Sequence, residues 1–295
     1  MKSLICMALS LLFGFLSPGL SFQEKEIAVL SDEMILLQYR DLVPGEVIKV
    51  LIEKKPFIQS AQIKFLDEKY EFAEKEEFFI CLIGLDLGIE TGVYPLYVYV
   101  YKQDGHFEIK KKEINIHSKH FPVKKLWVKE EFVTPPRSVL ERIRRESQLT
   151  KAIYGIYSPE WDVDGNFIIP VQGEMFPNFG ERRLFNNKPR SQHSGIDIAS
   201  PQGMPVKASN SGQVVLASHL YFSGKTVMLD HGLGVLSIYC HFSEITVETG
   251  QEVEKGEIIG KIGSTGRVTG PHLHWSIKIR GSRVDPNSLL SLKFN

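Results

Sequence analysis

Histidine and aspartate side chains stand at short, fixed spacings in the second half of this 295-residue chain. His272 and His274 belong to the stretch Gly-Pro-His-Leu-His-Trp that begins at Gly270, and an earlier stretch holds His193 and Asp197. Neutral imidazole together with carboxylate is the ligand set of catalytic zinc sites that keep one position open for water. The residue types and their spacing therefore predict metal-dependent chemistry in this half of the chain.

The alternating residues 275–279 indicate a strand that begins beside His272 and His274. Residues two apart lie on the same face of a strand, roughly 6.6 Å apart along it. Both imidazoles can therefore point into one site while Leu273 points into the core. One of them could bind a metal while the other reaches a water molecule on that metal.

His193 and Asp197 cannot both reach one metal from a straight strand. Four fully extended residues span roughly 13 Å, whereas bonds to zinc are about 2 Å long. We therefore expect the chain to bend between them, and Gly195 is the residue that permits the bend. His193 is expected on a loop and Asp197 on the strand that follows it.

A third segment with chemically active side chains is Tyr239-Cys240-His241. Strand alternation predicts that Tyr239 and His241 share one face and that Cys240 lies on the other. Two other histidines of this half lack partners at a suitable spacing. His231 is expected in a turn, and it is left out of the site together with His219.

Residues 22–125 are predicted to form an N-terminal β-sandwich of the immunoglobulin type. Short runs rich in β-branched and aromatic residues alternate here with turn signals, as they do in such sandwiches. Residues 78–85 are apolar on both faces, as a central strand would be. No catalytic spacing is visible in this part, and its histidines are expected on the surface: His106, His117 and His120.

Residues 126–166 are predicted to link this sandwich to a second domain at residues 167–295. A connecting helix is expected from Arg137 to about Tyr154, with apolar residues near one face, namely Leu140, Ile143, Leu149 and Ile153. The second domain is punctuated by glycines, and short strand-like runs fall between them. This pattern is typical of an antiparallel sheet or sandwich joined by tight turns.

Residues 1–21 have the pattern of a cleaved secretory signal, because a lysine precedes a short apolar run and small residues follow it. No later apolar run is long enough to cross a membrane. We therefore expect an exported chain in the periplasm or cell envelope, or outside the cell. Its formal net charge of zero argues against nucleic-acid binding by phosphate neutralisation. Cys81 and Cys240 are expected to be buried free thiols, with a bridge between them left open.

The three segments together resemble the signature of the M23 zinc metallopeptidases, the lysostaphin-like peptidoglycan endopeptidases. The resemblance covers roughly residues 168–290. It rests on His193-x-Gly195-x-Asp197, Tyr239-x-His241 and His272-x-His274, with supporting matches at residues 179–182, 263–266 and 284–286. Three ordered motifs in series make it highly specific.

The resemblance implies a mainly β fold whose C-terminal part is a small antiparallel β-sandwich of the lysostaphin-like, duplicated hybrid motif type. It implies one zinc ion bound by His193, Asp197 and His274, and it implies two catalytic histidines, His241 and His272. The expected activity is hydrolysis of peptide crosslinks or bridges in bacterial peptidoglycan. The bond, the oligomeric state and the division of roles between the two histidines stay open. So does the N-terminal half, which could target or autoinhibit the site.

Interpretations from other classes stand beside this one. A non-catalytic regulator of other wall hydrolases would hold zinc but cleave nothing. The glycine-rich β segment also resembles the glucose-type phosphocarrier domain of the sugar phosphotransferase system, which uses two facing histidines. The export signal and Asp197 argue against that carrier. A purely structural wall protein would leave the clustered histidines unexplained.

Overall fold

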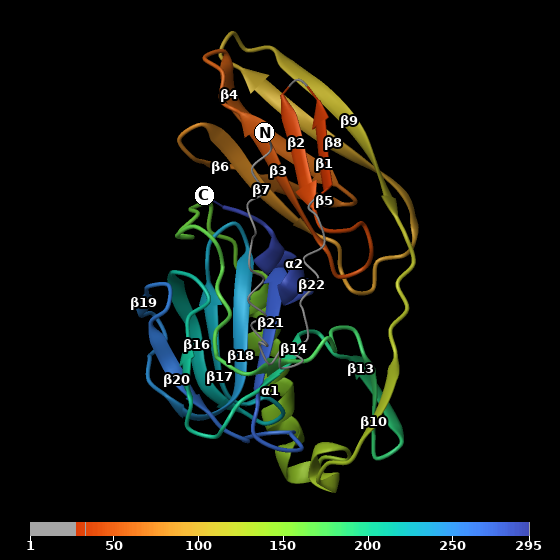
Figure 1. Cartoon of the computed structure of the whole chain (residues 1–295), viewed down its shortest axis with the longest axis vertical. Coiled ribbons are helices and arrows are strands. Elements are labelled where there is room, and N and C mark those ends of the chain that lie inside the picture. The colour runs from red at the N-terminus through yellow and green to blue at the C-terminus, as the bar shows by residue number, and fades with distance from the viewer. Residues whose placement is uncertain (1–27, 33, 295) are drawn as a thin grey trace, which may run out of the picture.

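The computed structural model describes residues 28–32 and 34–294, and the predicted signal segment at residues 1–21 lies outside them. Within this part of the chain the fold is mainly β, which confirms the predicted fold class. Figure 1 shows the N-terminal half as layered strands at the top and the C-terminal half as a second β body below, with helix α1 (Arg137–Tyr154) toward its lower end. None of the described helices is long and apolar enough to cross a membrane.

The N-terminal half is a sandwich of two antiparallel sheets. The first consists, in spatial order, of β1 (Ala28–Asp32), β2 (Ile35–Tyr39), β3 (Val47–Glu53), β7 (Phe78–Gly84) and β6 (Ala73–Glu74). The second consists of β5 (Glu68–Glu71), β4 (Ile58–Phe65), β8 (Gly92–Lys102) and β9 (Phe107–Ile116). Alternate side chains of both sheets enter one apolar core, as Val50 of β3 and Val98 of β8 do without any exposed surface.

Strand β7 is buried on both faces, as its apolar sequence predicts. Cys81 and Ile83 point into the core of the sandwich, whereas Ile80 and Leu82 belong to the apolar core of the C-terminal half. The two halves therefore share a continuous apolar interface along this strand, in addition to the chain that links them.

Polar contacts reinforce the interface between the halves. The guanidinium of Arg40 donates to the carboxylate of Glu46 in its own half and to that of Asp285 in the other half, at 2.8 Å for Asp285. Asp285 is also the N-cap of helix α2 (Pro286–Ser291). The ion triad thus connects the N-terminal sandwich to the start of the last helix.

The segment that links the halves packs along the C-terminal half. Strand β10 (Val123–Leu126) pairs in parallel with β12 (Arg182–Phe185), which pairs antiparallel with β13 (Lys188–Gln192). A 3-10 helix, η1 (Glu130–Phe132), then leads toward α1. The predicted domain boundary at residue 125 falls within β10.

Helix α1 has the bounds that its sequence predicts, but only part of its apolar face packs. Ile153 is buried against the sheet, whereas Leu140 and Leu149 are 49% and 45% exposed. The four apolar residues near the predicted face therefore do not all pack. The face that α1 turns toward the sheet carries Ile143 and Thr150, which line a groove, and neither exposed leucine belongs to that lining.

The C-terminal half is built on a ten-stranded antiparallel sheet. Its main path runs, in spatial order, through β11 (Glu174–Met175), β14 (Ile196–Ala199), β21 (Leu273–Ile279), β18 (Val235–Ile245), β17 (Gly224–Asp230), β16 (Gly212–Leu220) and β19 (Glu252–Val253). Off this path lie β15 (Pro205–Lys207), β20 (Ile258–Ile262) and β22 (Ser282–Val284). Tyr239 of β18 and Trp275 of β21 have no exposed surface and occupy the core face of the sheet.

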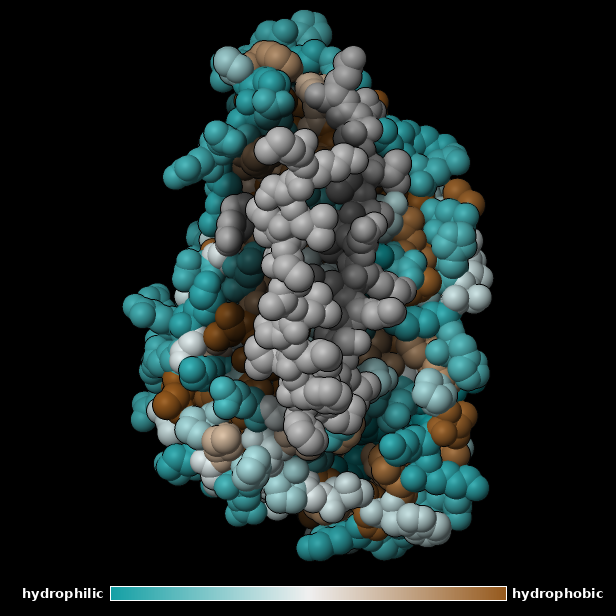
Figure 2. Space-filling view, in the orientation of Figure 1, coloured by the Kyte–Doolittle hydropathy of each residue, from teal (hydrophilic) through white to brown (hydrophobic). Residues whose placement is uncertain are grey.

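The outer surface has the polarity expected of balanced charges. Figure 2 shows a face on which hydrophilic residues dominate outside the grey atoms, with smaller hydrophobic areas between them. The whole chain has 35 basic and 35 acidic residues. The visible face is therefore largely polar outside the grey atoms.

Candidate metal centre

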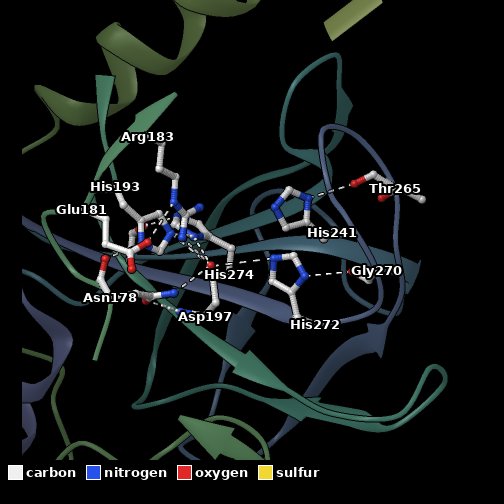
Figure 3. A network of polar contacts seen from close by, with 11 residues as sticks. Asn178, Glu181, Arg183, His193, Asp197, His241, Thr265, Gly270, His272 and His274 are labelled. Carbon is white, nitrogen blue, oxygen red and sulfur yellow. Dashed lines mark hydrogen bonds and ion pairs between the residues drawn. The ribbon is translucent and has the colours of Figure 1, made fainter. Parts of the chain in front are cut away.

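Adjacent strands of the large sheet bring predicted site residues together. Strand β14 pairs with β21 so that Asp197 lies directly opposite His274. On its other side β21 pairs with β18, where Cys240 lies opposite His274. His274 thus stands on a strand with a partner on each side, and the sheet itself sets its position relative to Asp197. Figure 3 shows the polar network that surrounds these residues.

His193 lies on the loop between β13 and β14, and Asp197 lies on β14, as the sequence predicts. The backbone of His193 is held from two sides. Its N–H donates to the carbonyl oxygen of Glu181 at 2.9 Å, and its own carbonyl oxygen accepts from the N–H of Gly180 at 2.7 Å. The loop is therefore tied to the chain that precedes β12.

Gly195 is needed for a different reason than the expected one. Its φ is not among the positive values that only glycine adopts readily. A Cβ at this position would lie 2.4 Å from the carbonyl oxygen of Trp275 and 2.3 Å from Oγ of Ser276. Glycine is thus required by the close approach of this loop to β21, more than by an unusual bend.

Three potential ligand atoms converge on one point. Nε2 of His193 lies 2.8 Å from Nδ1 of His274 and 3.1 Å from Oδ1 of Asp197. Nδ1 of His274 lies 3.0 Å from the same Oδ1. A tetrahedral zinc site with bonds of about 2.0–2.1 Å separates its ligand atoms by about 3.3 Å. This group of two imidazoles and a carboxylate therefore has the spacing of a metal site.

The other hydrogen bonds of the two imidazoles direct lone pairs into this triangle. Nδ1–H of His193 donates to the carbonyl oxygen of Asn178 at 2.9 Å, which leaves a lone pair on Nε2. Nε2 of His274 lies 2.7 Å from Oγ of Ser276, and the tautomer that donates there leaves a lone pair on Nδ1. Two lone pairs and a carboxylate oxygen at such distances repel one another without a shared cation. The donor set therefore fits a zinc ion.

The second oxygen of Asp197 has partners of its own. Oδ2 accepts hydrogen bonds from Arg183 at 2.7 Å and from Nδ2 of Asn178 at 3.0 Å, while Oδ1 of Asn178 accepts from the backbone N–H of Asp197. Burial opposes the charged form of this carboxyl, whereas the guanidinium of Arg183 and the amide of Asn178 favour it by donating to Oδ2. Asp197 is therefore ionised at neutral pH.

Two further histidines flank the triangle. Nδ1–H of His272 donates to the carbonyl oxygen of Gly270 at 2.8 Å, and its Nε2 lies 3.7 Å from Oδ1 of Asp197. Nδ1–H of His241 donates to the carbonyl oxygen of Thr265 at 2.8 Å. The two rings are 5.0 Å apart between centres, and Figure 3 shows each tied to the backbone beside it. In each of the two rings, the proton on Nδ1 leaves Nε2 free to accept another proton.

His241 reaches this site in a way that strand alternation does not predict. Regular alternation would place it with Tyr239, whose side chain is fully buried in the core. Instead His241 has a φ of 71° and lies at an irregularity in the pairing of β17 with β18. Its side chain turns to the face of Cys240 and His274, with which it lines one groove. The prediction that Tyr239 and His241 share one face is therefore wrong, whereas Cys240 lies on the opposite face from Tyr239 as predicted.

The imidazoles that face the site are kept neutral. Burial lowers the pKa of His241 well below its ordinary value, and the neighbouring His272 and His274 lower it further. Burial also lowers the pKa of His272 and of His274, and in both cases the carboxylate of Asp197 partly offsets it. Neutral imidazole is the form that binds metals and accepts protons.

Two grooves meet at His241. One, of about 440 Å³, runs beside α1, where Glu146 lines it. The other, of about 410 Å³, runs beside β10, where Lys124 lines it. Arg183 and Arg267 line both. His193 and His274 line the first groove, and Asp197 lines the second. An extended peptide lying in both grooves would therefore pass over the metal triangle with the middle of its length.

The remaining histidines and the cysteines lie outside the metal triangle. His231, which is fully buried, donates through Nδ1–H to the carbonyl oxygen of Ser211 at 2.6 Å, and burial lowers its pKa to about 4. The other histidines are exposed, as predicted for the surface ones: His106, His117, His120 and His219. The cysteines are buried free thiols in separate apolar clusters, as expected, which excludes the bridge that the sequence left open: Cys81 and Cys240.

Spacing patterns do not reveal the residues that orient the ligands. Asn178, Arg183 and Ser276 contact Asp197 or His274 through single side chains, and single polar residues carry no spacing pattern. The one available signal is the supporting match at residues 179–182, which directly follows Asn178. Geometry was needed to find all three.

Comparisons with known proteins agree with this geometry. The model of peptidase family M23 matches residues 191–286. The peptidoglycan DD-endopeptidase ShyA of Vibrio cholerae is 43% identical over 109 residues, which are 37% of this chain and 25% of the relative. The DD-carboxypeptidase/endopeptidase Mpg of Neisseria meningitidis is 45% identical over 97 residues, 33% of this chain and 22% of the relative. A solved structure from Pseudomonas aeruginosa, described as a peptidase M23, is 30% identical to this chain and superposes with a TM-score of 0.66. The match covers 85% of this chain and 96% of the chain in that structure.

The last comparison extends over both halves of the molecule. The fold is therefore that of a β-rich peptidase M23 protein with an N-terminal sandwich. The chain belongs to peptidase family M23. Its matched segment spans about a quarter of the length of the curated relatives.

Proposed function

We propose that this chain is a zinc endopeptidase that hydrolyses peptide crosslinks or bridges of bacterial peptidoglycan. The main support is the convergence of His193 Nε2, Asp197 Oδ1 and His274 Nδ1 within 3.1 Å of one another. Two more imidazoles with acceptor nitrogens stand beside this triangle. A metal site that is flanked by proton acceptors and lies between two grooves has the parts that peptide hydrolysis requires.

His193, Asp197 and His274 would hold one zinc ion per chain. Bound there, zinc would polarise a peptide carbonyl as a Lewis acid and lower the pKa of a water ligand to about 7. Asn178 and Arg183 bind the second oxygen of Asp197, so its Oδ1 stays turned toward the two imidazoles. Such outer contacts hold the ligands in the orientation that binding needs.

His241 and His272 would carry the proton transfers. Each donates its Nδ1–H to a backbone carbonyl at 2.8 Å, which aims Nε2 away from the backbone as an acceptor. One of them takes a proton from the water molecule as its oxygen attacks the peptide carbonyl carbon. The imidazolium that results stabilises the oxyanion of the tetrahedral intermediate. The proton then moves to the leaving amine nitrogen as the C–N bond breaks.

The substrate class is proposed from the relatives. ShyA and Mpg are named as endopeptidases, ShyA for peptidoglycan, and the segment that matches the family model, residues 191–286, contains the five site residues. We infer that this chain acts on the same class of polymer, in the cell envelope. The two grooves beside the triangle would receive its stem or bridge peptides.

Digestion of purified sacculi tests the proposal. The exported chain, residues 22–295, is loaded with zinc and incubated with peptidoglycan, and the released fragments are identified by mass spectrometry. We expect new peptide termini at crosslinks or bridges, with the glycan strands intact. Bound zinc with no released peptide would contradict the endopeptidase and favour the non-catalytic regulator of other wall hydrolases.

A further inference from the structure

An arginine beside the site is held between two aromatic rings. Arg267 belongs to the loop that joins β20 to β21, the loop that also carries Thr265 and Gly270. The central carbon of its guanidinium lies 4.5 Å from the ring centre of Phe185 and 4.9 Å from that of Phe222. Contact with two aromatic rings restricts the positions that the guanidinium can adopt.

This guanidinium has no anionic partner among residues 34–294. No side-chain hydrogen bond or ion pair there joins Arg267 to a carboxylate, although its backbone N–H donates to the carbonyl oxygen of Phe222. Burial lowers its pKa to about 10, and the nearby charges of Arg190 and Arg183 contribute to the shift. A partly buried cation near two others is unfavourable unless an anion joins it.

The acidic residues around Arg267 are engaged elsewhere. Glu146 accepts from Arg142 through one oxygen and from the backbone N–H of Tyr221 through the other. Asp197 faces the metal triangle and Arg183. The groove beside α1 therefore presents more positive than negative charge, with Lys278 as a further cation in its lining.

We propose that Arg267 binds a carboxylate of the peptide substrate beside the scissile bond and thereby selects acidic peptides. This assignment rests on the proposed function, because peptidoglycan peptides carry free carboxyl groups. A planar guanidinium matches a carboxylate with two parallel hydrogen bonds. Because the rings of Phe185 and Phe222 already restrict the guanidinium of Arg267, this side chain loses little conformational freedom on binding. Arg267 lines both grooves, so the carboxylate would lie close to the point where they meet.

Binding of a matched pair of ligands tests this assignment. The probes are a crosslinked muropeptide and the same muropeptide with its free carboxyl groups converted to carboxamides. Calorimetry uses the zinc-loaded full chain with His272→Ala, so that the ligand stays intact during the titration. Arg267→Met keeps an unbranched side chain beside the two rings. Arg267→Lys keeps the positive charge but removes the planar guanidinium that can donate two parallel hydrogen bonds.

The control is Arg280→Met. Arg280 is also stacked on two rings, those of Tyr157 at 4.7 Å and Tyr70 at 5.7 Å, but it lies at the interface between the halves. Its loss should leave the preference between the two probes unchanged. Circular dichroism and the melting temperature check that each variant folds. If Arg267→Met does not fold, Arg267→Lys carries the test.

We expect the acidic muropeptide to bind about 10- to 100-fold more tightly than its carboxamide, the range of a hydrogen bond to a charged group. Arg267→Met should remove this preference, and Arg267→Lys should restore only part of it. Equal binding of the two probes, no binding of either, or a preference that survives in Arg267→Met would overturn the assignment. The sacculus digestion tests the proposed activity separately from this binding experiment. A chain that digests no peptidoglycan but still prefers the acidic probe would refute the proposed activity and leave the role of Arg267 intact.

Discussion

Asp197 and His274 face each other in register on the neighbouring strands β14 and β21, and Oδ1 of Asp197 lies 3.0 Å from Nδ1 of His274. Two of the three proposed ligands thus stand on paired strands, where backbone hydrogen bonds set their separation. The third, His193, is on a loop whose backbone is tied down on both sides. A site built on such rigid elements is arranged before the metal arrives.

Replacement of His272 by alanine should separate metal binding from catalysis. Its Nε2 lies 3.7 Å from Asp197 Oδ1, and it is outside the three-residue metal group. We expect zinc to stay bound while turnover of crosslinked muropeptides falls by about 10²- to 10⁴-fold, the usual contribution of a general acid or base. Elemental analysis and initial rates measure the two effects. The exposed His219→Ala is the control, and full activity of His272→Ala would show that the role is misassigned.

Asn178 should raise the affinity of the site for zinc, although it is not a proposed metal ligand. It accepts from the backbone N–H of Asp197 and donates to Oδ2 of the same residue. Loss of such an outer contact weakens metal binding by about 10- to 100-fold, and we expect this for Asn178→Ala. Competition with a zinc chelator measures the affinity. Asn210→Ala removes another buried asparagine far from the triangle, and an equal loss in both variants would point to general destabilisation instead.

Period-two alternation was enough to predict the face of β21 that carries the site. Leu273 is fully buried, and His272 and His274 both lie on the site face. The bend between His193 and Asp197 also followed from chain geometry alone, because a straight strand could not bring both to one ion. Local rules sufficed here because each conclusion depends on residues that are close in sequence.

Other features depend on contacts between distant segments. His241 enters the site through a pairing irregularity between β17 and β18, and alternation within one strand cannot reveal such a shift. The role of Gly195 depends on how closely its loop approaches Trp275. Leu140 and Leu149 are exposed, although their spacing resembles that of a buried face. Tertiary packing decided all of these.

The Arg40 triad should stabilise the interface between the halves. The side chains of Arg40, Glu46 and Asp285 are only 14%, 2% and 9% exposed. Arg40→Met leaves two buried carboxylates without this partner, so we expect a loss of about 3–5 kcal/mol in the free energy of unfolding. Urea denaturation measures the change. Arg144→Met, which removes an exposed ion pair with Glu141, should have no measurable effect, and equal stabilities of the two variants would refute the role of the triad.

His231 should make stability depend on pH. Its pKa in the folded chain is about 4, below the ordinary value of about 6.5, because the side chain is buried. Between these values the unfolded chain binds a proton that the folded chain does not, so stability falls as the pH falls. The full contribution is present above pH 6.5, and about 3 kcal/mol is lost by pH 4.

Denaturation of the zinc-loaded chain at several pH values between 4 and 7 measures this slope. His231→Gln has no titrating group at this position, so its unfolding free energy should depend less steeply on pH than that of the parent chain. Other groups contribute equally to both chains, and the difference between the slopes therefore isolates His231. Equal slopes of unfolding free energy against pH in the two chains would mean that His231 has the same pKa in the folded and unfolded states.

Stepwise addition of zinc to the metal-free chain tests the central claim most directly, with cleavage of crosslinked muropeptide as the readout. Activity should rise linearly and stop rising at one zinc per chain, and Asp197→Ala should show neither tight binding nor activity at that point. Activity that is independent of zinc, or that persists in Asp197→Ala at one equivalent, would contradict a site formed by His193, Asp197 and His274.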